Sequence, residues 1–412
     1  MPAPAARPIP SPPPSPRSDP RSAAPVAALW RDGALRGGPI EAWSPVHPDR
    51  LLPPAGRRWI GAICYEIGHA LEPTSTAHRP GSPPAGPRID PIWGYGGWCG
   101  LTPSSGSEAI PAAGVPESPG GYALGPLRSR TGRSRYTAAA AEAIRLVHAG
   151  DAYQVNLAHP LVGRFEGCPR ALFADLAAAA DPAFGCYAEL PPLPDGRRRC
   201  ILGLSPELLL RYDAATRRLT TEPMKGTRPQ SRHARRDLEH AAKDRAELAM
   251  IVDLMRNDLG RVAEVGSVRV DQPRRVDRHG RDAAGVWQAS ARVSATLRRK
   301  LSLHDALRAV LPAGSITGAP KVRAMQAIHA LENEPRGAYC GAIGSIDERG
   351  NAELAVGIRT ATIAGDRFRY WVGAGIVADS DPHAEWSETL AKAAPLRAIG
   401  VEIEDDAGGD AP

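Results

Sequence analysis

Long hydrophobic runs are missing from this chain of 412 residues. No stretch approaches the roughly 18 consecutive apolar residues of a membrane-spanning helix, so we expect no membrane association. Residues 1–25 are rich in Pro, Ser, Ala and Arg and lack the apolar core of a secretory signal, so they are typical of a disordered arm. The six cysteines are scattered without C-x-x-C or metal-like spacing, which favours a cytoplasmic protein with reduced thiols.

Aromatic residues are also scarce, at 5% of the chain. The densest basic stretches, residues 197–199 and 273–282, contain no aromatic side chain. Nucleic-acid-binding surfaces usually combine basic charge with a recognisable motif or with rings that stack on bases, so the composition argues against a nucleic-acid partner. A formal net charge of +6 suits a small anionic substrate at least as well.

Lysine is the rarest cation, with five lysines against 46 arginines. A guanidinium stays charged, whereas an ε-amine can lose its proton and act as a nucleophile or base. Lysines retained in an arginine-rich chain are therefore candidates for chemistry or for a close-fitting contact. Lys300 follows two arginines, and its presence is explained by chance. The other four lie in motif-like segments: Lys225, Lys243, Lys321 and Lys392.

The distribution of apolar and turn residues divides the rest of the chain. Residues 26–130 combine Gly, Pro and short apolar runs, which predicts a β-rich region with mobile loops at 73–91 and 102–120. Residues 134–404 form the second predicted region and residues 405–412 a tail. Strands and helices alternate irregularly in the second region, so we expect a mixed α/β (α+β) fold with antiparallel-rich sheets rather than a doubly wound parallel sheet.

Hydrophobic periodicity predicts the individual elements of this second region. Residues 151–157 alternate apolar side chains with Gln154 and Asn156, which indicates a strand with one polar face. A single long helix is expected at 234–259, ending before Gly260. Further helices are expected at 134–149, 302–310, 319–331 and 382–399, and further strands at 200–212, 217–222, 262–270, 286–297, 339–347, 352–363 and 367–377.

Two pairs of carboxylates share one spacing. Asp244 and Glu247 lie three residues apart in one predicted helix, and Glu385 and Glu388 lie three apart in another. Residues three apart share a helix face, so each pair presents two acidic groups together. Four carboxylates converging from two helices would suit Mg²⁺, although acidic pairs are also common on exposed helix faces.

Two glycine-rich segments, residues 312–321 and 373–380, allow backbone N–H groups to approach an anion closely. The first precedes a predicted helix, whose N-terminus adds favourable partial charge. Neither segment is a Walker loop or a dinucleotide fingerprint, so no nucleotide is implied. Tight turns are the alternative explanation for both.

Seven motifs follow one another along the second region. They are Gly-Asp-Ala-Tyr-Gln-Val-Asn-Leu from 150, Ser-Pro-Glu from 205, Pro-Met-Lys-Gly-Thr-Arg-Pro from 223, the run from Lys243 to Gly260, Gly-Ser-Ile-Thr-Gly-Ala-Pro-Lys from 314, Gly-Ile-Arg-Thr from 357, and residues 373–392 ending in Glu-x-x-Glu-Thr-x-x-Lys. In this order they resemble the chorismate-utilising enzymes, most closely the aminodeoxychorismate synthase component I group. The resemblance covers roughly residues 134–400, and a fainter likeness at residues 61–68 extends it. It implies large antiparallel-rich sheets packed as a sandwich and flanked by helices.

The resemblance also implies the ligands of the site. A Mg²⁺ ion would be bound through Glu247 and Glu388, with Asp244 and Glu385 acting through water, and would hold the ring carboxylate of chorismate. The two carboxylates of chorismate would be bound by Gly226, Thr227, Thr317, Tyr339, Arg359, Gly373, Ala374, Gly375 and Lys392.

Two further residues define the implied reaction. Glu207 resembles the general acid that protonates the C4 hydroxyl of chorismate, and its pKa would need to be raised by burial. Lys225 resembles the lysine that attacks C2 of the ring and forms a covalent adduct. Ammonia then attacks C4 and displaces the lysine. A carboxylate clamp without covalency is the alternative role for Lys225.

Three positions bear on the subfamily. Anthranilate and isochorismate synthases typically carry Ala at the position of Lys225, and isochorismate and salicylate synthases carry a lysine base where this chain has Gln154. Gln cannot deprotonate water, so amine transfer at C4 is favoured over hydroxylation at C2. Gln288 is a departure, because the family usually has His there.

The predicted function is Mg²⁺-dependent amination of chorismate to 4-amino-4-deoxychorismate, an intermediate towards p-aminobenzoate and folate or towards p-aminophenyl-type natural products. The alternatives are anthranilate synthase component I and a non-catalytic ligand-binding or regulatory protein on the same fold. A glutamine amidotransferase would add about 180 residues by ordinary domain sizes, so we expect a separate glutaminase subunit as the ammonia source.

Overall fold

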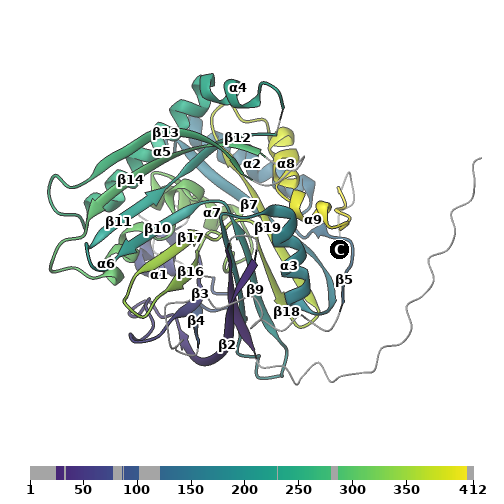
Figure 1. Ribbon diagram of the computed structural model, residues 1–412. Coiled ribbons are helices and arrows are strands. Elements are labelled where there is room, and N and C mark those ends of the chain that lie inside the picture. Colours follow the sequence, from purple (N-terminus) through teal and green to yellow (C-terminus); the bar gives the residue numbers. More distant parts are fainter. Residues whose placement is uncertain are drawn as a thin grey trace, which may run out of the picture.

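The computed structural model describes residues 25–405 apart from 32–33, 78–85, 87, 102–120, 230 and 280–285. Its strands form one antiparallel network that folds into two sheets, and the long strand β2 (Ala34–Pro45) belongs to both. Figure 1 shows the sheets splaying apart towards the upper left, with helices on their outer sides. Residues 1–24 of the predicted arm, about half of the 73–91 loop, the 102–120 loop and most of the tail lie outside the described residues.

The first sheet has the order β2–β1–β8–β9–β18–β19–β7, and short strands pair with the far edge of β7. Its bounds are β1 (Val26–Arg31), β5 (Tyr122–Leu124), β6 (Arg128–Ser129), β7 (Gln154–Gly167), β8 (Phe184–Leu190), β9 (Arg199–Ser205), β15 (Gly318–Ala319), β18 (Thr360–Ala364) and β19 (Arg367–Ile376).

The second sheet has the order β2–β4–β3–β16–β17–β10–β11–β14–β13, and β12 also pairs with β14. Its bounds are β3 (Trp59–Ile63), β4 (Gly96–Leu101), β10 (Leu208–Asp213), β11 (Arg218–Glu222), β12 (Met224–Pro229), β13 (Arg269–His279), β14 (Val286–Thr296), β16 (Ala342–Ile346) and β17 (Ala352–Val356).

Helices pack against both sheets, and in Figure 1 most of them lie around the outside, whereas α7 is drawn near the middle of the molecule. Apolar side chains of α2, α3, α8 and α9 join the core of the first sheet, and those of α5 and α6 join that of the second. Their bounds are α1 (Ile67–Leu71), α2 (Arg133–His148), α3 (Pro169–Ala180), α4 (Ala234–His240), α5 (Ala242–Gly260), α6 (Leu303–Val310), α7 (Lys321–Leu331), α8 (Pro382–Ala391) and α9 (Ala394–Ala398).

A third apolar cluster lies between the two sheets. It joins β3, β4, β16 and β17 of the second sheet to β1, β8 and β9 of the first, through side chains such as Ile60, Ile201 and Ile343. The two sheets therefore form the expected sandwich, and the antiparallel-rich α+β fold is confirmed. No helix among the described ranges is long and apolar enough to span a membrane.

Several predicted elements are divided in the structure. The helix predicted at 234–259 is two helices, because Ala241 has extended backbone angles of φ −62° and ψ 108°. The strand predicted at 200–212 is β9 plus β10, and the strand predicted at 352–363 is β17 plus β18. The helix predicted at 382–399 is α8 plus α9, and the strand predicted at 262–270 begins only at Arg269.

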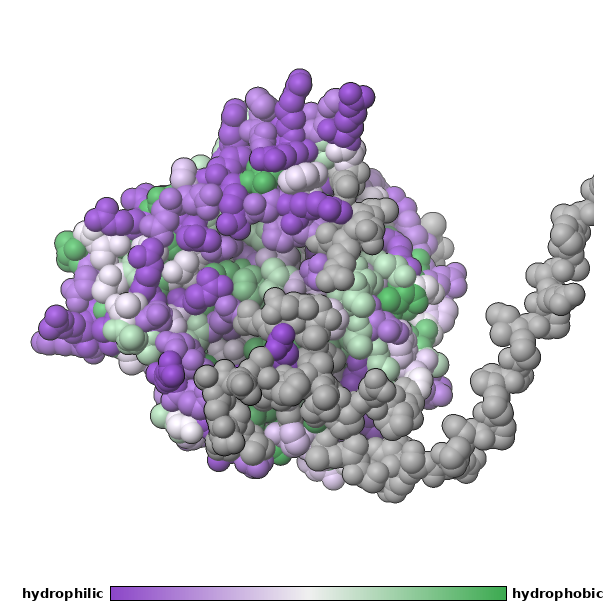
Figure 2. Space-filling model, viewed as in Figure 1, coloured by the Kyte–Doolittle hydropathy of each residue, from purple (hydrophilic) through white to green (hydrophobic). Residues whose placement is uncertain are grey.

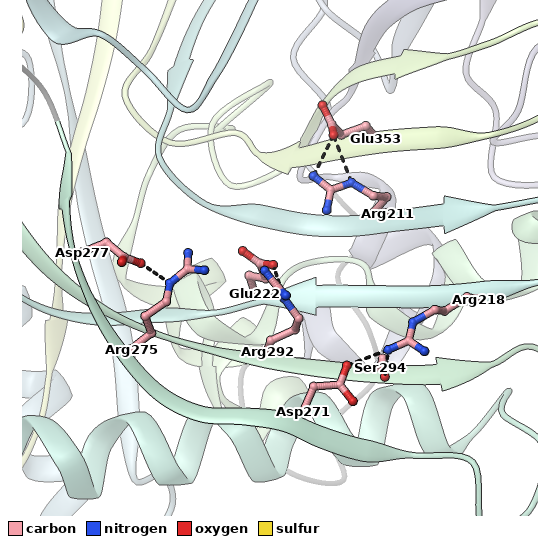
Figure 3. Close-up of polar contacts among 9 residues, drawn as sticks. All are labelled: Arg211, Arg218, Glu222, Asp271, Arg275, Asp277, Arg292, Ser294 and Glu353. Atoms are coloured by element: carbon pink, nitrogen blue, oxygen red, sulfur yellow. Dashed lines mark hydrogen bonds and ion pairs between the residues drawn. The ribbon is translucent and has the colours of Figure 1, made fainter.

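One face of the second sheet carries ion pairs in place of an apolar layer. Arginines and carboxylates pair between strands or along β13, as Figure 3 shows. Hydrophilic residues likewise cover much of the upper and left surface in Figure 2, where α4 and the β13–β14 hairpin lie. Because positive and negative side chains are mixed on this face, it is a solvated surface without an excess of either charge. The pairs are Arg211–Glu353, Arg218–Asp271, Arg275–Asp277 and Arg292–Glu222.

Candidate active site

Two residues of the predicted site lie where the chain passes from one sheet to the other. β9 belongs to the first sheet and β10 to the second, and the link between them carries Glu207. β17 and β18 likewise belong to different sheets, and their link carries Arg359. The two divided strands thus bring an acid and a cation to the junction of the sheets.

A bulge in β12 presents Lys225. The register of β12 against β14 shifts between Met224 and Thr227, so Lys225 and Gly226 stand outside the regular ladder. Gly226 has φ +89°, and a Cβ there would lie 2.9 Å from the Asp244 Oδ1 atom of α5. Glycine is therefore required for both its backbone angle and the close approach of the first turn of α5.

The amine of Lys225 lies among the predicted acidic groups. Its Nζ is 3.3 Å from Glu247 Oε2, and its charge also acts on Glu207. A Cβ at Gly375 would lie 3.1 Å from Lys225 Nζ and 3.0 Å from Gln154 Nε2. The glycines of β19, the polar residue of β7 and the lysine of β12 therefore meet at one place. Residues 373–375 were expected to form a turn, but they pair with β7 in regular register as part of strand β19.

Glu207 is buried with only 4% of its surface exposed. Burial raises its pKa to about 7, while a hydrogen bond from Ser315 and the charge of Lys225 act in the opposite direction. The Ser315 hydroxyl donates to Glu207 Oε1 at 2.5 Å. The sequence interpretation used the segment around Ser315 only for its backbone amides and missed this hydroxyl.

Each of the four predicted metal carboxylates has a polar partner. Two belong to α5: Glu247 pairs with Lys225, and Asp244 accepts from Arg228 at 2.6 Å. On α8, Glu388 lies 3.0 Å from Lys392 Nζ, and Glu385 accepts from the Ser380 hydroxyl at 2.6 Å. Two lysines therefore lie among the carboxylates of the two helices.

The charges of these groups are coupled. Burial would raise the pKa of Glu388, but the positive charges of Lys392, Lys225 and Lys243 outweigh burial and lower it. Burial raises the pKa of Glu385, and the negative charge of Glu388 adds to that rise. The two helices therefore face one shared electrostatic environment.

The carboxylate oxygens are the donor type that Mg²⁺ prefers, so the chemistry of this set fits the predicted ion. Among the residues that the structure describes, however, no three Asp, Glu, His or Cys side chains gather closely enough to hold a metal ion. Mg²⁺ would have to replace Lys225 at Glu247 and Lys392 at Glu388. The metal site stays a prediction.

Arg359 is suited to bind an anion. It adopts φ +50°, a left-handed conformation that costs a non-glycine residue roughly 1–3 kcal/mol. Its side chain makes no hydrogen bond or ion pair within the described part of the chain.

Tyr339 is buried and stacked on Trp371, with ring centroids 5.7 Å apart. Its hydroxyl lies next to Gly373.

The remaining predicted binding residues differ in what they offer. Lys392 donates to the Gly373 carbonyl at 2.5 Å and so lies against the glycine segment of β19, in which Ala374 is fully buried. The Thr317 hydroxyl donates to the Ala313 carbonyl at 2.8 Å and therefore holds its own loop. A ligand could meet Thr317 only by exchanging that bond.

Two buried amides carry oxygen atoms without a hydrogen-bond partner among the described residues: Gln154 Oε1 and Gln288 Oε1. Gln288 also donates weakly to the Thr227 hydroxyl, at 3.3 Å. Buried acceptors that stay unpaired are costly and are expected where a ligand supplies the donor. The pattern of unpaired atoms could not be obtained from the sequence.

Lys321 has a structural role. Its amine lies 2.5 Å from the buried Asp258 carboxylate of α5 and near the last carbonyls of α6, those of Ala309 and Val310. The lysine therefore joins the ends of α5 and α6 to the start of α7, which is the close-fitting contact expected of a retained lysine. Lys243 is exposed on the first turn of α5.

Comparisons with known proteins identify the family to which this chain belongs. The model of the chorismate binding enzyme family matches residues 103–398. The chain is 40% identical over 278 residues to an aminodeoxychorismate synthase of Streptomyces griseus, covering 66% of this chain and 37% of that protein. It is also 40% identical to aminodeoxychorismate synthase component 1 of Escherichia coli and to anthranilate synthase component 1 of Aquifex aeolicus.

These two matches cover 60% and 62% of this chain, and 53% and 51% of the relatives, so the chain spans about half the length of the curated proteins that it matches. Anthranilate synthase component I of Streptococcus pneumoniae superposes with a TM-score of 0.65 at 25% identity, covering 89% of both chains. The menaquinone-specific isochorismate synthase of Escherichia coli, at 21% identity and TM-score 0.65 over 91% of this chain and 88% of that chain, shares the fold. The chain belongs to the chorismate binding enzyme family.

Proposed function

We propose that this protein aminates chorismate at C4, giving 4-amino-4-deoxychorismate, with Mg²⁺ as cofactor. The observation that carries the proposal is the meeting of the Lys225 amine with the buried acid Glu207 and with Gln154. Gln154 cannot act as the base that hydroxylation by water needs. A primary amine beside a carboxylic acid suits substitution at the ring.

In this proposal Glu207 protonates the C4 hydroxyl of chorismate while the Lys225 amine attacks C2. A C2–N bond forms, the C4–O bond breaks, and water leaves. Ammonia then attacks C4, and the C2–N bond breaks to return the free lysine. The sum is chorismate plus ammonia giving 4-amino-4-deoxychorismate plus water. The neutral amine is the form of Lys225 that attacks, so Mg²⁺ would have to take the place of the lysine at Glu247 beforehand. Glu207 regains its proton from the ammonium group formed at C4.

Glu247 and Glu388 would hold Mg²⁺ directly, and Asp244 and Glu385 would act through water. When bound, the ion supplies positive charge beside the ring carboxylate of the substrate. Arg359 offers a planar fork of donors for a second carboxylate, and Gly373 and Gly375 would let a substrate approach the backbone of β19 closely because they carry no side chain.

The ammonia is proposed to come from a separate glutaminase subunit, and two of the relatives are themselves named component 1. The isolated chain is then expected to turn over chorismate with ammonium salts and to give no product with glutamine alone. Chromatography of the products, with Mg²⁺ present in both reactions, checks this. Glutamine-driven turnover by the chain alone would rule out the separate subunit.

Ser315→Ala is expected to move the alkaline limb of the pH–rate profile upwards. Glu207 must be protonated to act as an acid, so the rate falls as pH rises through its pKa, about 7. The Ser315 hydrogen bond favours the carboxylate, and a bond to a charged group is worth about 1.5 kcal/mol, or about one pH unit. Losing the bond therefore raises the pKa and shifts the midpoint upwards by about that amount.

Ser205→Ala is the matched control for this shift. The Ser205 hydroxyl bonds the backbone of Glu207 and leaves its carboxylate untouched. The midpoint of the alkaline limb should therefore stay in place in Ser205→Ala. An unshifted limb in Ser315→Ala would show that Glu207 does not set this limb.

Anthranilate synthase activity is the second candidate, because relatives of both names share 40% identity with this chain. That activity would release o-aminobenzoate and pyruvate from chorismate and ammonia. Detecting both products with the purified chain would replace the proposed reaction. A chain that binds chorismate without consuming it would instead be the ligand-binding or regulatory protein.

A further inference from the structure

His159 is a buried titratable residue of β7 that the proposed reaction does not use. Its surface is fully buried, and burial lowers its pKa to about 3, so the imidazole is neutral at ordinary pH. Both ring nitrogens have hydroxyl partners, Ser129 at 2.9 Å and Thr389 at 2.8 Å. The imidazole therefore bridges β6 to α8, the helix that carries Glu385 and Glu388.

The hydrogen-bond network assigns the tautomer of this ring. The Thr389 hydroxyl donates to the Trp386 carbonyl at 2.7 Å, so it must accept from His159 Nε2–H. Nδ1 is then an acceptor and takes the hydrogen of Ser129, whose oxygen in turn accepts from the Gly132 amide at 3.1 Å. One continuous chain of donors and acceptors thus runs into α8 without an unpaired group.

The two residues on the inner face of α8 have the same three-residue spacing as its two carboxylates, and each follows its carboxylate by one residue. Trp386 and Thr389 are fully buried and lie three residues apart, as do Glu385 and Glu388. His159 touches both inner residues: its ring stacks on Trp386 with centroids 4.6 Å apart and planes 14° apart, and Nε2 bonds Thr389. Because successive helix residues are about 100° apart, fixing the inner pair fixes the direction of the outer pair.

We propose that His159 is a positioning residue for the acidic face of α8, which it sets through Trp386 and Thr389 so that Glu385 and Glu388 face Lys225. This inference rests on the proposed Mg²⁺ site. Its backbone supports the same role, because His159 lies opposite Val372, one residue before the glycines of β19. A single side chain therefore holds α8 to the strand pair that carries Gly373 and Gly375.

The test is the affinity for Mg²⁺ alone, measured by calorimetric titration without substrate. Thr389→Val keeps the shape of the side chain and removes the hydroxyl, whereas Thr389→Ser keeps the hydroxyl. We expect Thr389→Val and His159→Leu to weaken Mg²⁺ binding about 10–100-fold, the usual effect of losing a residue that orients metal ligands. Thr389→Ser should bind Mg²⁺ as the unchanged protein does.

His69→Leu is the matched control, because His69 is also buried and bonds a serine, Ser75, at 2.7 Å, but lies in the α1 region. It should lose stability and keep its Mg²⁺ affinity. Native affinity in Thr389→Val, or an equal loss in His69→Leu, would overturn the positioning role alone. An unchanged protein that binds no Mg²⁺ would overturn the proposed metal site as well.

A second measurement does not depend on variants that fold. The ¹⁵N NMR spectrum of the unchanged protein should show His159 as the Nε2–H tautomer from about pH 5 to 8, because its protonation lies well below that range. The signals are assigned by their loss in His159→Leu or, if that variant does not fold, by their shift in Thr389→Ser. An Nδ1–H tautomer or a charged ring in this range would contradict the network.

Discussion

Replacing Glu207 with glutamine is expected to lower the turnover number by about 10²–10⁴-fold, the usual contribution of a general acid. Glutamine keeps the size of the side chain and its hydrogen bond with Ser315, but it cannot donate a proton to the leaving hydroxyl. The Michaelis constant for chorismate should change little, because the lost interaction belongs to the transition state. Steady-state kinetics with ammonium and Mg²⁺ provide both values.

The same variant should be more stable than the unchanged protein at alkaline pH. Burial raises the pKa of Glu207 to about 7, so the folded state resists an ionisation that the unfolded chain undergoes at lower pH. The free energy of unfolding of the unchanged protein therefore falls as pH rises from the ordinary glutamate range to about 7. A neutral glutamine does not ionise and avoids that fall. Denaturant unfolding at pH 5 and pH 8 measures the difference.

Glu353→Gln controls for the substitution itself. Glu353 pairs with Arg211 on the ion-pair face of the second sheet, as Figure 3 shows. Turnover should be unchanged in this variant. If Glu207→Gln kept more than a tenth of native turnover, another group would have to protonate the leaving hydroxyl.

Lys225→Ala and Lys225→Arg are expected to lower turnover by a factor on the order of 10³ or more, as losing a nucleophile does. Arginine preserves the positive charge opposite Glu247 but cannot attack carbon, because its guanidinium stays protonated. The two variants together separate nucleophilic attack from charge. Loss in both indicates attack by the amine.

Mass spectrometry gives a direct measurement of the same step. The unchanged protein incubated with chorismate and Mg²⁺ but without ammonia should carry a covalent adduct on the peptide that contains Lys225. Neither variant should carry it. Activity retained in Lys225→Arg, together with no adduct in the unchanged protein, would identify Lys225 as a carboxylate clamp.

The general architecture could be predicted from the sequence because the hydrophobic periods of its longer elements are clear. The helix at residues 133–148 and the strand at 367–376 have nearly the expected bounds. The sequence prediction ran each divided strand through its link because apolar residues flank both links, although the first contains Pro206 and Glu207 and the second Gly357 and Arg359. Which sheet a strand joins depends on partners far away in the sequence, such as the pairing of β17 with β10.

Site residues that belong to a contiguous sequence motif could be predicted. Contacts between residues far apart in the sequence could not. The Glu207, Lys225 and Glu247 positions follow from sequence motifs, and the structure brings these three side chains together. The bond between Ser315 and Glu207 joins residues 108 positions apart. The break at Ala241 carries neither Gly nor Pro, so nothing local marked the start of α5.

The links that carry Glu207 and Arg359 make the separation of acid and cation depend on how the sandwich layers are spaced. Each residue is tethered to both layers, and the filling between them consists of side chains such as Ile60, Ile201 and Ile343. The size of these side chains therefore affects how far apart the two layers lie at the links that carry Glu207 and Arg359. The packing of this interior therefore affects the positions of the reacting groups as well as the stability of the fold.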